Sequence, residues 1–162
     1  MPATIEQTIL TNLAALHTTL MTSGIRTVFP YAPFSIAPQS LPAIVVFTGQ
    51  DIPTGKGASA WYELVRDYEC RYYVRQAQQG ETNDVETACI PFIALGRDLY
   101  LSHPSLNPGP AAGNQAPLVM DSKYYGCSGV AIMADYAGTQ FVGIVHKIKV
   151  TYKVPYNYGN YE

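Results

Sequence analysis

The sequence FVGIVHKIKVTYKV, residues Phe141–Val154, decides the fold of this chain. Its apolar residues alternate with polar ones, and a period of two is typical of a half-buried antiparallel strand. His146 is the one interruption of the apolar side. The opposite side carries Lys147, Lys149, Thr151 and Lys153. We therefore predict a long strand with one face in the core and one basic face in water. The residues of the apolar side are Val142, Ile144, Ile148, Val150, Tyr152 and Val154.

A second long strand is predicted over Trp61–Gln76, where apolar residues again share one parity. Arg66 interrupts the apolar parity of this strand. The other parity is charged with both signs, which indicates cross-strand ion pairs or a subunit contact rather than an active site. Its charged residues are Glu63, Asp67, Glu69, Arg71 and Arg75.

Shorter segments complete the predicted strands. Ile25–Tyr31 reads as an extended run, and the prolines at 30, 33, 38 and 42 that follow favour an extended loop. Residues 43–48 (AIVVFT) are a continuous apolar run and predict a buried strand. Residues 49–59 are polar and glycine-bearing and predict a loop. Gly57 follows Lys56 there, so the spacing of a phosphate-binding loop is absent.

Two helices are predicted from apolar residues at three- and four-residue spacing. The first covers Ile5–Met21, with Thr4 and Gln7 as a capping pair and Gly24 as its stop. Its stripe is Ile5, Ile9, Leu13, Leu16 and Leu20.

The second predicted helix covers Asp84–Leu101, with Thr82 or Asn83 as its cap. Pro91 removes a backbone donor near its middle, so we expect a kink or a two-piece helix. Its stripe is Val85, Ala88, Phe92, Leu95 and Leu99.

Residues 102–117 contain four prolines and read as a long loop. Gly129–Tyr136 then pairs with the closing strand as a hairpin around Ala137 and Gly138. The expected fold class is α+β: an antiparallel, possibly mixed, sheet of about four to five strands packed with two main helices and long loops. We expect a single domain over residues 1–154 and a tyrosine-rich extension over residues 155–162.

The composition favours a protein that assembles with partners. Charged residues make up 14% of the chain, against about 25% in average soluble domains. The 13 tyrosines fit the same interpretation, since tyrosine is enriched at interfaces. A net charge of -2 gives no bulk electrostatic case for binding nucleic acid. Alternating lysines on the closing strand are usually a solvated face that also discourages edge pairing, and a local basic stripe is the alternative.

The reactive residues show no catalytic or metal-binding pattern. The three cysteines are far apart and odd in number, which favours a reducing compartment over a disulfide framework. We interpret His146 as a hydrogen-bonded core or interface residue, His17 as a surface residue and His103 as a helix stop. We expect no enzyme activity, no cofactor, no metal and no membrane segment, in a protein made in a cytoplasm.

The last residues, YNYGNY, leave two readings open. A short terminus without a core of its own frays. Three tyrosines in six residues also suit docking on a neighbouring subunit. We assign partner contacts to nine residues, namely Arg66, Arg71, Arg75, Lys147, Lys149, Lys153, Tyr156, Tyr158 and Tyr161.

The chain resembles the tail terminator proteins, also called tail-completion or neck proteins, of long-tailed bacteriophages. The likeness lies in the layout of nearly the whole chain rather than in an invariant motif. The segments that carry it are IEQTILTNLAALHTTL, FPYAPFSIAPQSLPAIVVF, YELVRDYECRYYVR, DVETACIPFIALGRDLYL with HPSL after it, and FVGIVHKIKVTYKV.

This resemblance implies a structural virion protein with a compact fold of an antiparallel sheet flanked by helices. Such proteins form a ring, typically a hexamer, that stops growth of the tail tube and joins it to the head connector. The implied partners are further copies of the chain, the tail tube protein and the head–tail connector. The resemblance implies no cofactor and no catalytic residue, and any DNA would pass through the ring without sequence-specific contact.

Two alternatives stay open at this point. One is another head–tail joining or minor tail protein. The other, from a different class, is a small α/β ligand-binding or enzymatic domain.

Overall fold

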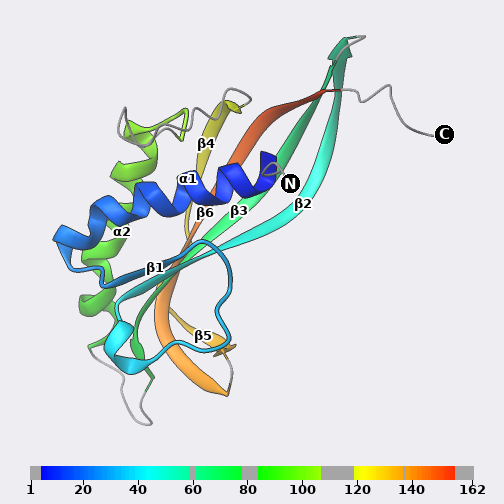
Figure 1. The fold of residues 1–162 in the computed structure, drawn as a ribbon. Coiled ribbons are helices and arrows are strands. Elements are labelled where there is room, and N and C mark those ends of the chain that lie inside the picture. Colours follow the sequence, from blue (N-terminus) through cyan, green and yellow to red (C-terminus); the bar gives the residue numbers. More distant parts are fainter. Residues whose placement is uncertain (1–4, 59–60, 78–83, 107–118, 137, 156–162) are drawn as a thin grey trace.

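A computed structural model describes residues 5–58, 61–77, 84–106, 119–136 and 138–155 (Figure 1). The helices are α1 (Ile5–Thr18) and α2 (Val85–Ser102), with short 3-10 turns η1 (Thr19–Ser23) and η2 (Pro38–Ser40). The strands are β1 (Thr27–Phe29), β2 (Ala43–Ala58), β3 (Trp61–Gln76), β4 (Val119–Cys127), β5 (Ala131–Tyr136) and β6 (Thr139–Pro155). The fold class is α+β, as predicted.

The strands form one mixed, mostly antiparallel sheet. Five of them follow the order β1-β2-β3-β6-β4, and only the β1–β2 pair is parallel. β5 pairs with β6 beyond the end of β4, and both run antiparallel to it. β4 and β5 therefore form one long hairpin arm with β6, interrupted at residues 128–130. The Ser128 hydroxyl accepts a hydrogen bond from the Val145 N–H at 2.9 Å within this interruption.

β6 confirms the strand predicted over Phe141–Val154 and extends it at both ends. Every residue of the predicted apolar parity from Val142 to Tyr152, His146 included, is buried. Burial of one face explains why the alternation is so regular, because a slip of one residue would put the lysines into the core. β5 and β6 pair as predicted, with Tyr136 opposite Thr139, and Gly138 between them has a φ of 80°. Ala137, the other residue predicted for this turn, lies outside the described residues.

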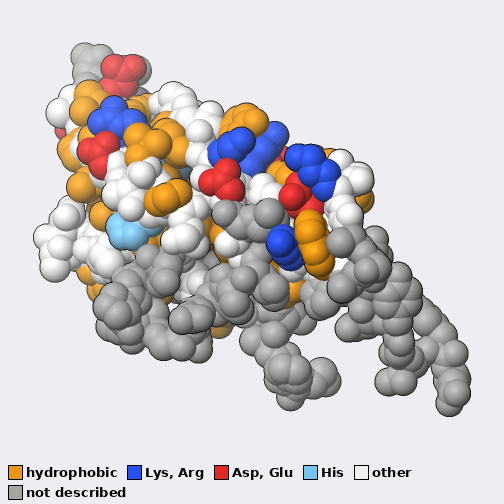
Figure 2. Space-filling model, turned by 90° about the horizontal axis from the view of Figure 1, so that it is seen from above, with side chains coloured by type: hydrophobic (Ala, Val, Ile, Leu, Met, Phe, Trp, Pro, Cys, Tyr) orange, Lys and Arg blue, Asp and Glu red, His pale blue; other side chains and the backbone are white. Residues whose placement is uncertain are grey.

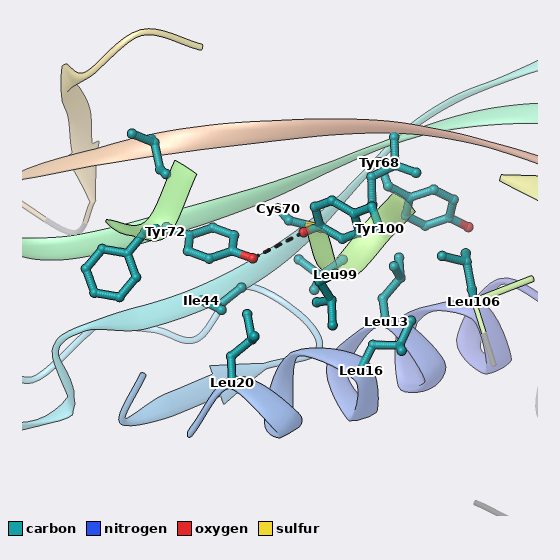
Figure 3. Close-up of a cluster of buried hydrophobic side chains, with 14 of the residues drawn as sticks. Leu13, Leu16, Leu20, Ile44, Tyr68, Cys70, Tyr72, Leu99, Tyr100 and Leu106 are labelled. Atoms are coloured by element: carbon teal, nitrogen blue, oxygen red, sulfur yellow. Dashed lines mark hydrogen bonds between the residues drawn. The ribbon is translucent and has the colours of Figure 1, made fainter. Parts of the chain in front are cut away.

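Both helices pack on the same face of the sheet. Leu13, Leu16 and Leu20 of α1 point toward the strands in Figure 3, and Leu99 and Tyr100 of α2 reach the same cluster. The other face, which we call the outer face, has its own smaller cluster of Ile36, Leu41, Ala43, Val45, Tyr73 and Phe141. The proline-bounded segment 30–42 therefore covers one end of the outer face.

Several predicted boundaries are wrong. β2 continues through the predicted loop 49–59 as far as Ala58, because β3 supplies hydrogen-bonding partners along its length. The glycines in this stretch serve bulges: the register shifts between Thr48 and Asp51 and again between Pro53 and Gly57. β4 was not predicted at all.

Other helix details also differ from the sequence prediction. α1 ends at Thr18 and η1 completes the predicted span, with Gly24 closing it at a φ of 102°. Pro91 lies inside α2, which is one uninterrupted helix rather than two pieces. The caps predicted at Thr4, Thr82 and Asn83 lie outside the described residues. His103 follows the last residue of α2, as predicted for a helix stop.

Candidate functional site

Among the described residues, the part of the outer face that segment 30–42 does not cover is the candidate site. It lies on β3 and β6, whose register places acidic residues opposite lysines. We call this set the charged strip; it consists of Glu63, Asp67 and Glu69 on β3 and Lys153, Lys149 and Lys147 on β6. Period-two alternation places all six on one face.

The charges of the strip are compensated within the chain. Lys147 Nζ lies 3.6 Å from Glu69 and Lys149 Nζ lies 4.0 Å from Asp67. Arg71 binds Glu69 from the same strand at 2.9 Å. This confirms the expected cross-strand ion pairs. Because these side chains are well exposed, each pair contributes about 0–1 kcal/mol to stability, so their main effect is to set a pattern of charge on the surface.

Aromatic side chains border the charged strip on three sides. Lys153 lies over the ring of Trp61 at 4.2 Å, and Lys149 lies over the ring of Tyr125 at 4.3 Å. On the β2 side, Arg71 lies over the ring of Phe47 at 4.3 Å. Figure 2 shows one view of the molecule in which basic and acidic side chains lie next to each other with hydrophobic ones between them. The surface is mixed rather than of one sign.

Exposed hydrophobic residues accompany the strip. Tyr125 is 61% exposed and Ile52 is 50% exposed. Two further exposed residues belong to the proline-bounded segment: Phe34 is 97% exposed, and Tyr31, which lines a hollow beside α1, is 69% exposed. None of these four residues is among the predicted contact residues. Only Phe34 had a local signal, the prolines around it, which fix φ and favour an extended loop.

The predicted contact residues do not all share one place. Lys147, Lys149 and Lys153 lie on the charged strip and Arg71 lies beside it. Arg75 does not, because a register shift between Tyr73 and Arg75 turns it to the helix-covered face, opposite Val142. This corrects its predicted place among the acids of the outer face. Tyr156, Tyr158 and Tyr161 lie outside the described residues.

Arg66 lies on the helix-covered face and forms a separate ion pair. Its guanidinium makes a two-pronged hydrogen bond to the Asp51 carboxylate, and the Tyr152 hydroxyl donates to the same carboxylate at 2.7 Å. The hydrogen bond from Arg66 lowers the pKa of Asp51, against the effect of burial. The group joins β2, β3 and β6 through these hydrogen bonds. This arrangement indicates a structural role for Arg66 rather than a partner contact.

We expect Asp51→Asn to lower the free energy of unfolding by about 1–3 kcal/mol, because it weakens charge-assisted hydrogen bonds from two strands. Urea unfolding followed by circular dichroism measures the change. Asp98→Asn is the matched control, since Asp98 is paired with Arg97 on an exposed helix surface. Its expected change is within about 0.5 kcal/mol. Equal effects of the two variants would contradict a structural role for Asp51.

Two hollows lie on the surface of the described residues. One of about 110 Å³ lies on the charged strip and is lined by Tyr68, Tyr125 and Ile148 together with the two ion pairs. A pocket for a small-molecule substrate is usually about 300–1,000 Å³. A wider, open hollow of about 360 Å³ between α1 and the segment after β1 is lined by Gln7, Leu10, Thr11, Pro30 and Tyr31. It brings together no acid–base pair.

Within the described part of the chain, no group of three or more His, Cys, Asp or Glu side chains could hold a metal ion. None of the described helices is long and apolar enough to cross a membrane. Comparison with known proteins gives no family model that matches the chain and no curated protein that matches it.

Proposed function

We propose that the protein is a ring-forming tail terminator of a long-tailed bacteriophage, which caps the tail tube and joins it to the head connector. The charged strip, with the exposed Tyr125 and the half-buried rings of Trp61 and Phe47 at its border, is the observation that carries this proposal. Helices cover one face of the sheet, and part of the other face is open among the described residues. Such an open face suits contact with a second protein surface. The layout of the whole chain resembles that family, and this resemblance is the reason to propose a ring.

The charge pattern favours a protein partner over nucleic acid. Each lysine of the strip lies opposite a carboxylate of β3 in the register, and two of the three are ion-paired. A surface that binds phosphates needs uncompensated positive charge, since counterion release supplies most of that affinity. Paired rows of both signs instead fix the register and orientation of a partner surface.

The sheet edges argue for contact through faces and loops rather than through continuous strand pairing. β1 covers only residues 43–45 of β2, and the free edge beyond them carries two register shifts and Pro53. β4, at the opposite edge, has register shifts of its own between Val119 and Asp121 and between Tyr124 and Gly126. Bulges and proline discourage edge-to-edge pairing. Neighbouring subunits of the ring then meet through the charged strip and the exposed aromatic residues.

The first test is the mass of the full chain in solution. Size-exclusion chromatography with light scattering, followed by negative-stain electron microscopy, is expected to show a closed ring, with a hexamer as the expected order. A strict monomer at high concentration, both alone and with added tail tube protein, would overturn the proposal. A two-fold dimer without ring closure would favour another head–tail joining or minor tail protein.

A pair of matched double variants locates the contact. Lys147→Glu with Tyr125→Ser changes two exposed residues of the outer face, whose side chains are 61% exposed in both cases. We expect assembly at least about tenfold weaker, because charged and aromatic anchors dominate interfaces. Arg97→Glu with Leu101→Ser makes the same chemical change on α2 and is expected to leave the ring intact. The reverse result would move the interface to the helical side.

The tyrosine-rich terminus has its own test. Deletion of residues 156–162 is expected to weaken ring formation or attachment to the head connector, because three tyrosines supply contact area at low entropic cost. Light scattering and a head-joining assay with purified parts measure the two effects. Unchanged results in both assays would refute docking of the terminus.

A small ligand-binding or enzymatic α/β domain is the candidate of another class. This candidate predicts a monomer whose melting temperature rises when its ligand binds. A thermal-shift screen of metabolites measures this rise. Location of the gene immediately upstream of a major tail protein gene would favour the terminator instead.

A further inference from the structure

A buried polar cluster joins both helices to the sheet. It contains His17 of α1, Tyr100 of α2, Tyr72 of β3, Tyr124 of β4 and His146 of β6, so five elements contribute one side chain each. Both histidines have no exposed surface. This corrects the prediction that His17 lies on the surface, and it confirms that His146 is a hydrogen-bonded core residue.

The hydrogen bonds fix a different tautomer for each histidine. His17 Nδ1 faces the Leu13 carbonyl at 2.6 Å, and a carbonyl only accepts, so Nδ1 carries the proton. His146 Nε2 faces the Phe92 carbonyl at 3.1 Å, so in this ring Nε2 carries the proton. The remaining nitrogen of each ring is a bare acceptor.

A tyrosine hydroxyl donates to each bare nitrogen. Tyr100 donates to His17 Nε2 at 2.5 Å, and Tyr124 donates to His146 Nδ1 at 3.1 Å. The Tyr100 oxygen then accepts from the Tyr72 hydroxyl at 3.4 Å, the contact drawn in Figure 3. In this series of hydrogen bonds each group donates to the next. Tyr72 donates to Tyr100, Tyr100 to His17, and His17 to the Leu13 carbonyl. The network is complete only while both rings are neutral.

We propose that this cluster is an acid-sensitive clamp, which holds the two helices on the sheet while His17 and His146 are neutral and releases them when the rings are protonated. A proton on either acceptor nitrogen turns it into a donor that faces another donor. The neighbouring tyrosine must then rotate its hydroxyl, and a positive charge remains buried without an opposite charge beside it.

The surroundings offer little to compensate that charge. The cluster is walled by the rings of Tyr72, Tyr100 and Tyr124, and Tyr72 lies 4.8 Å from the ring of His146. Cys70 of β3 contacts Tyr100, and burial raises the pKa of the Cys70 thiol to about 12, so it stays neutral. In the described part of the chain, no carboxylate hydrogen-bonds or ion-pairs with either histidine.

Charged groups act only on the rim of the cluster. Arg97 of α2 acts on Tyr124, and Glu69 of β3 acts on Cys70. Each histidine also repels a proton on the other, since the charge of His146 lowers the pKa of His17. Protonation of both rings is therefore disfavoured in two ways, by repulsion between the two charges and by the apolar surroundings.

The pH window follows from the difference between folded and unfolded states. Burial lowers the pKa of both His17 and His146 from 6.5 to about 4. Between these values the unfolded chain binds more protons than the folded one, so stability rises with pH. The clamp is at full strength above about pH 6.5 and weakens as the pH falls toward 4.

The test measures how unfolding depends on pH in the full chain. Urea unfolding is measured between pH 4.5 and 6. The logarithm of the unfolding constant is expected to fall by about two for each pH unit, which is about a hundredfold change. His17→Asn keeps a donor near the Leu13 carbonyl, and His146→Gln keeps one near the Phe92 carbonyl. Each variant is expected to reduce the slope by about one, whatever its own stability.

His103→Gln is the control, since His103 lies at the end of α2 outside the cluster; it is expected to retain the steep slope. Two-dimensional ¹⁵N NMR of the histidine rings supplies a second readout, with a proton on Nδ1 in His17 and on Nε2 in His146 at pH 7. The proposal is overturned if the slope is unchanged in both cluster variants, or if both rings show the same tautomer.

Discussion

Gly96→Ala is expected to destabilise the protein by about 3 kcal/mol or more, although alanine is the better helix former. A Cβ at this position of α2 would lie 2.7 Å from both Cδ2 and Cε1 of His146, and closer still to Nε2. Those ring atoms cannot retreat, because Nε2 donates to the Phe92 carbonyl and Nδ1 accepts from Tyr124. Overpacking of a core typically costs about 1–3 kcal/mol, and loss of the buried hydrogen bond adds about 1–3 kcal/mol.

Gly129→Ala is the matched control for this variant. A Cβ at Gly129 meets no atom within 4 Å. Urea unfolding at pH 7.5 is expected to show a change within about 0.5 kcal/mol for this control. His146→Ala removes the obstructing ring, so the double variant with Gly96→Ala should be more stable than the sum of the two single effects by about 1 kcal/mol or more. Additive effects would show that Gly96 does not make room for His146.

Alternation of apolar residues was sufficient to predict β6 and β3, for a physical reason. Both are central strands of the sheet with a buried face, and a period of two is the only pattern that keeps that face apolar. The lysine row and the acidic row of the charged strip follow from the same alternation. Their pairing does not, because it depends on register: Glu69 meets Lys147 only because Cys70 lies opposite His146.

The errors arise where distant residues override local patterns. Glycines and Pro53 make residues 49–58 look like a loop, yet β3 supplies a partner along this stretch and the glycines become bulges. His17 looks like a surface residue in the last turns of a helix. Its partner Tyr100 lies 83 positions away in the sequence, so the residues next to His17 give no indication of this contact.

The candidate site could be foreseen only in part. The lysines of β6 and Arg71 were identified from the sequence, but a single bulge sends Arg75 to the other face. Tyr125 and Ile52 were not identified, because an exposed hydrophobic residue in a strand has the same local pattern as a buried one. Only the placement of segment 30–42 over one end of the outer face shows which part of it stays bare.

Leu13→Ala is expected to lower the free energy of unfolding by about 2–5 kcal/mol, the usual range for a fully buried leucine. Leu13 has no exposed surface and points from α1 into the main cluster (Figure 3). Leu101→Ala is the matched control, since Leu101 is 63% exposed on α2, and its expected change is within about 0.5 kcal/mol. Urea unfolding at pH 7.5 measures both variants, with an unchanged m-value as the sign that the unfolded state is unaffected.

The size of the Leu13→Ala effect also shows which interactions hold α1 on the sheet. Leu13 and His17 lie one turn apart, and the Leu13 carbonyl accepts the hydrogen bond from His17. Truncation to alanine removes apolar contacts but keeps that carbonyl, whereas His17→Asn weakens the polar clamp but keeps the leucine. If burial dominates at neutral pH, Leu13→Ala costs more than His17→Asn at pH 7.5. A cost below about 1 kcal/mol for Leu13→Ala would contradict this, and the polar cluster rather than apolar burial would then be the main attachment of α1.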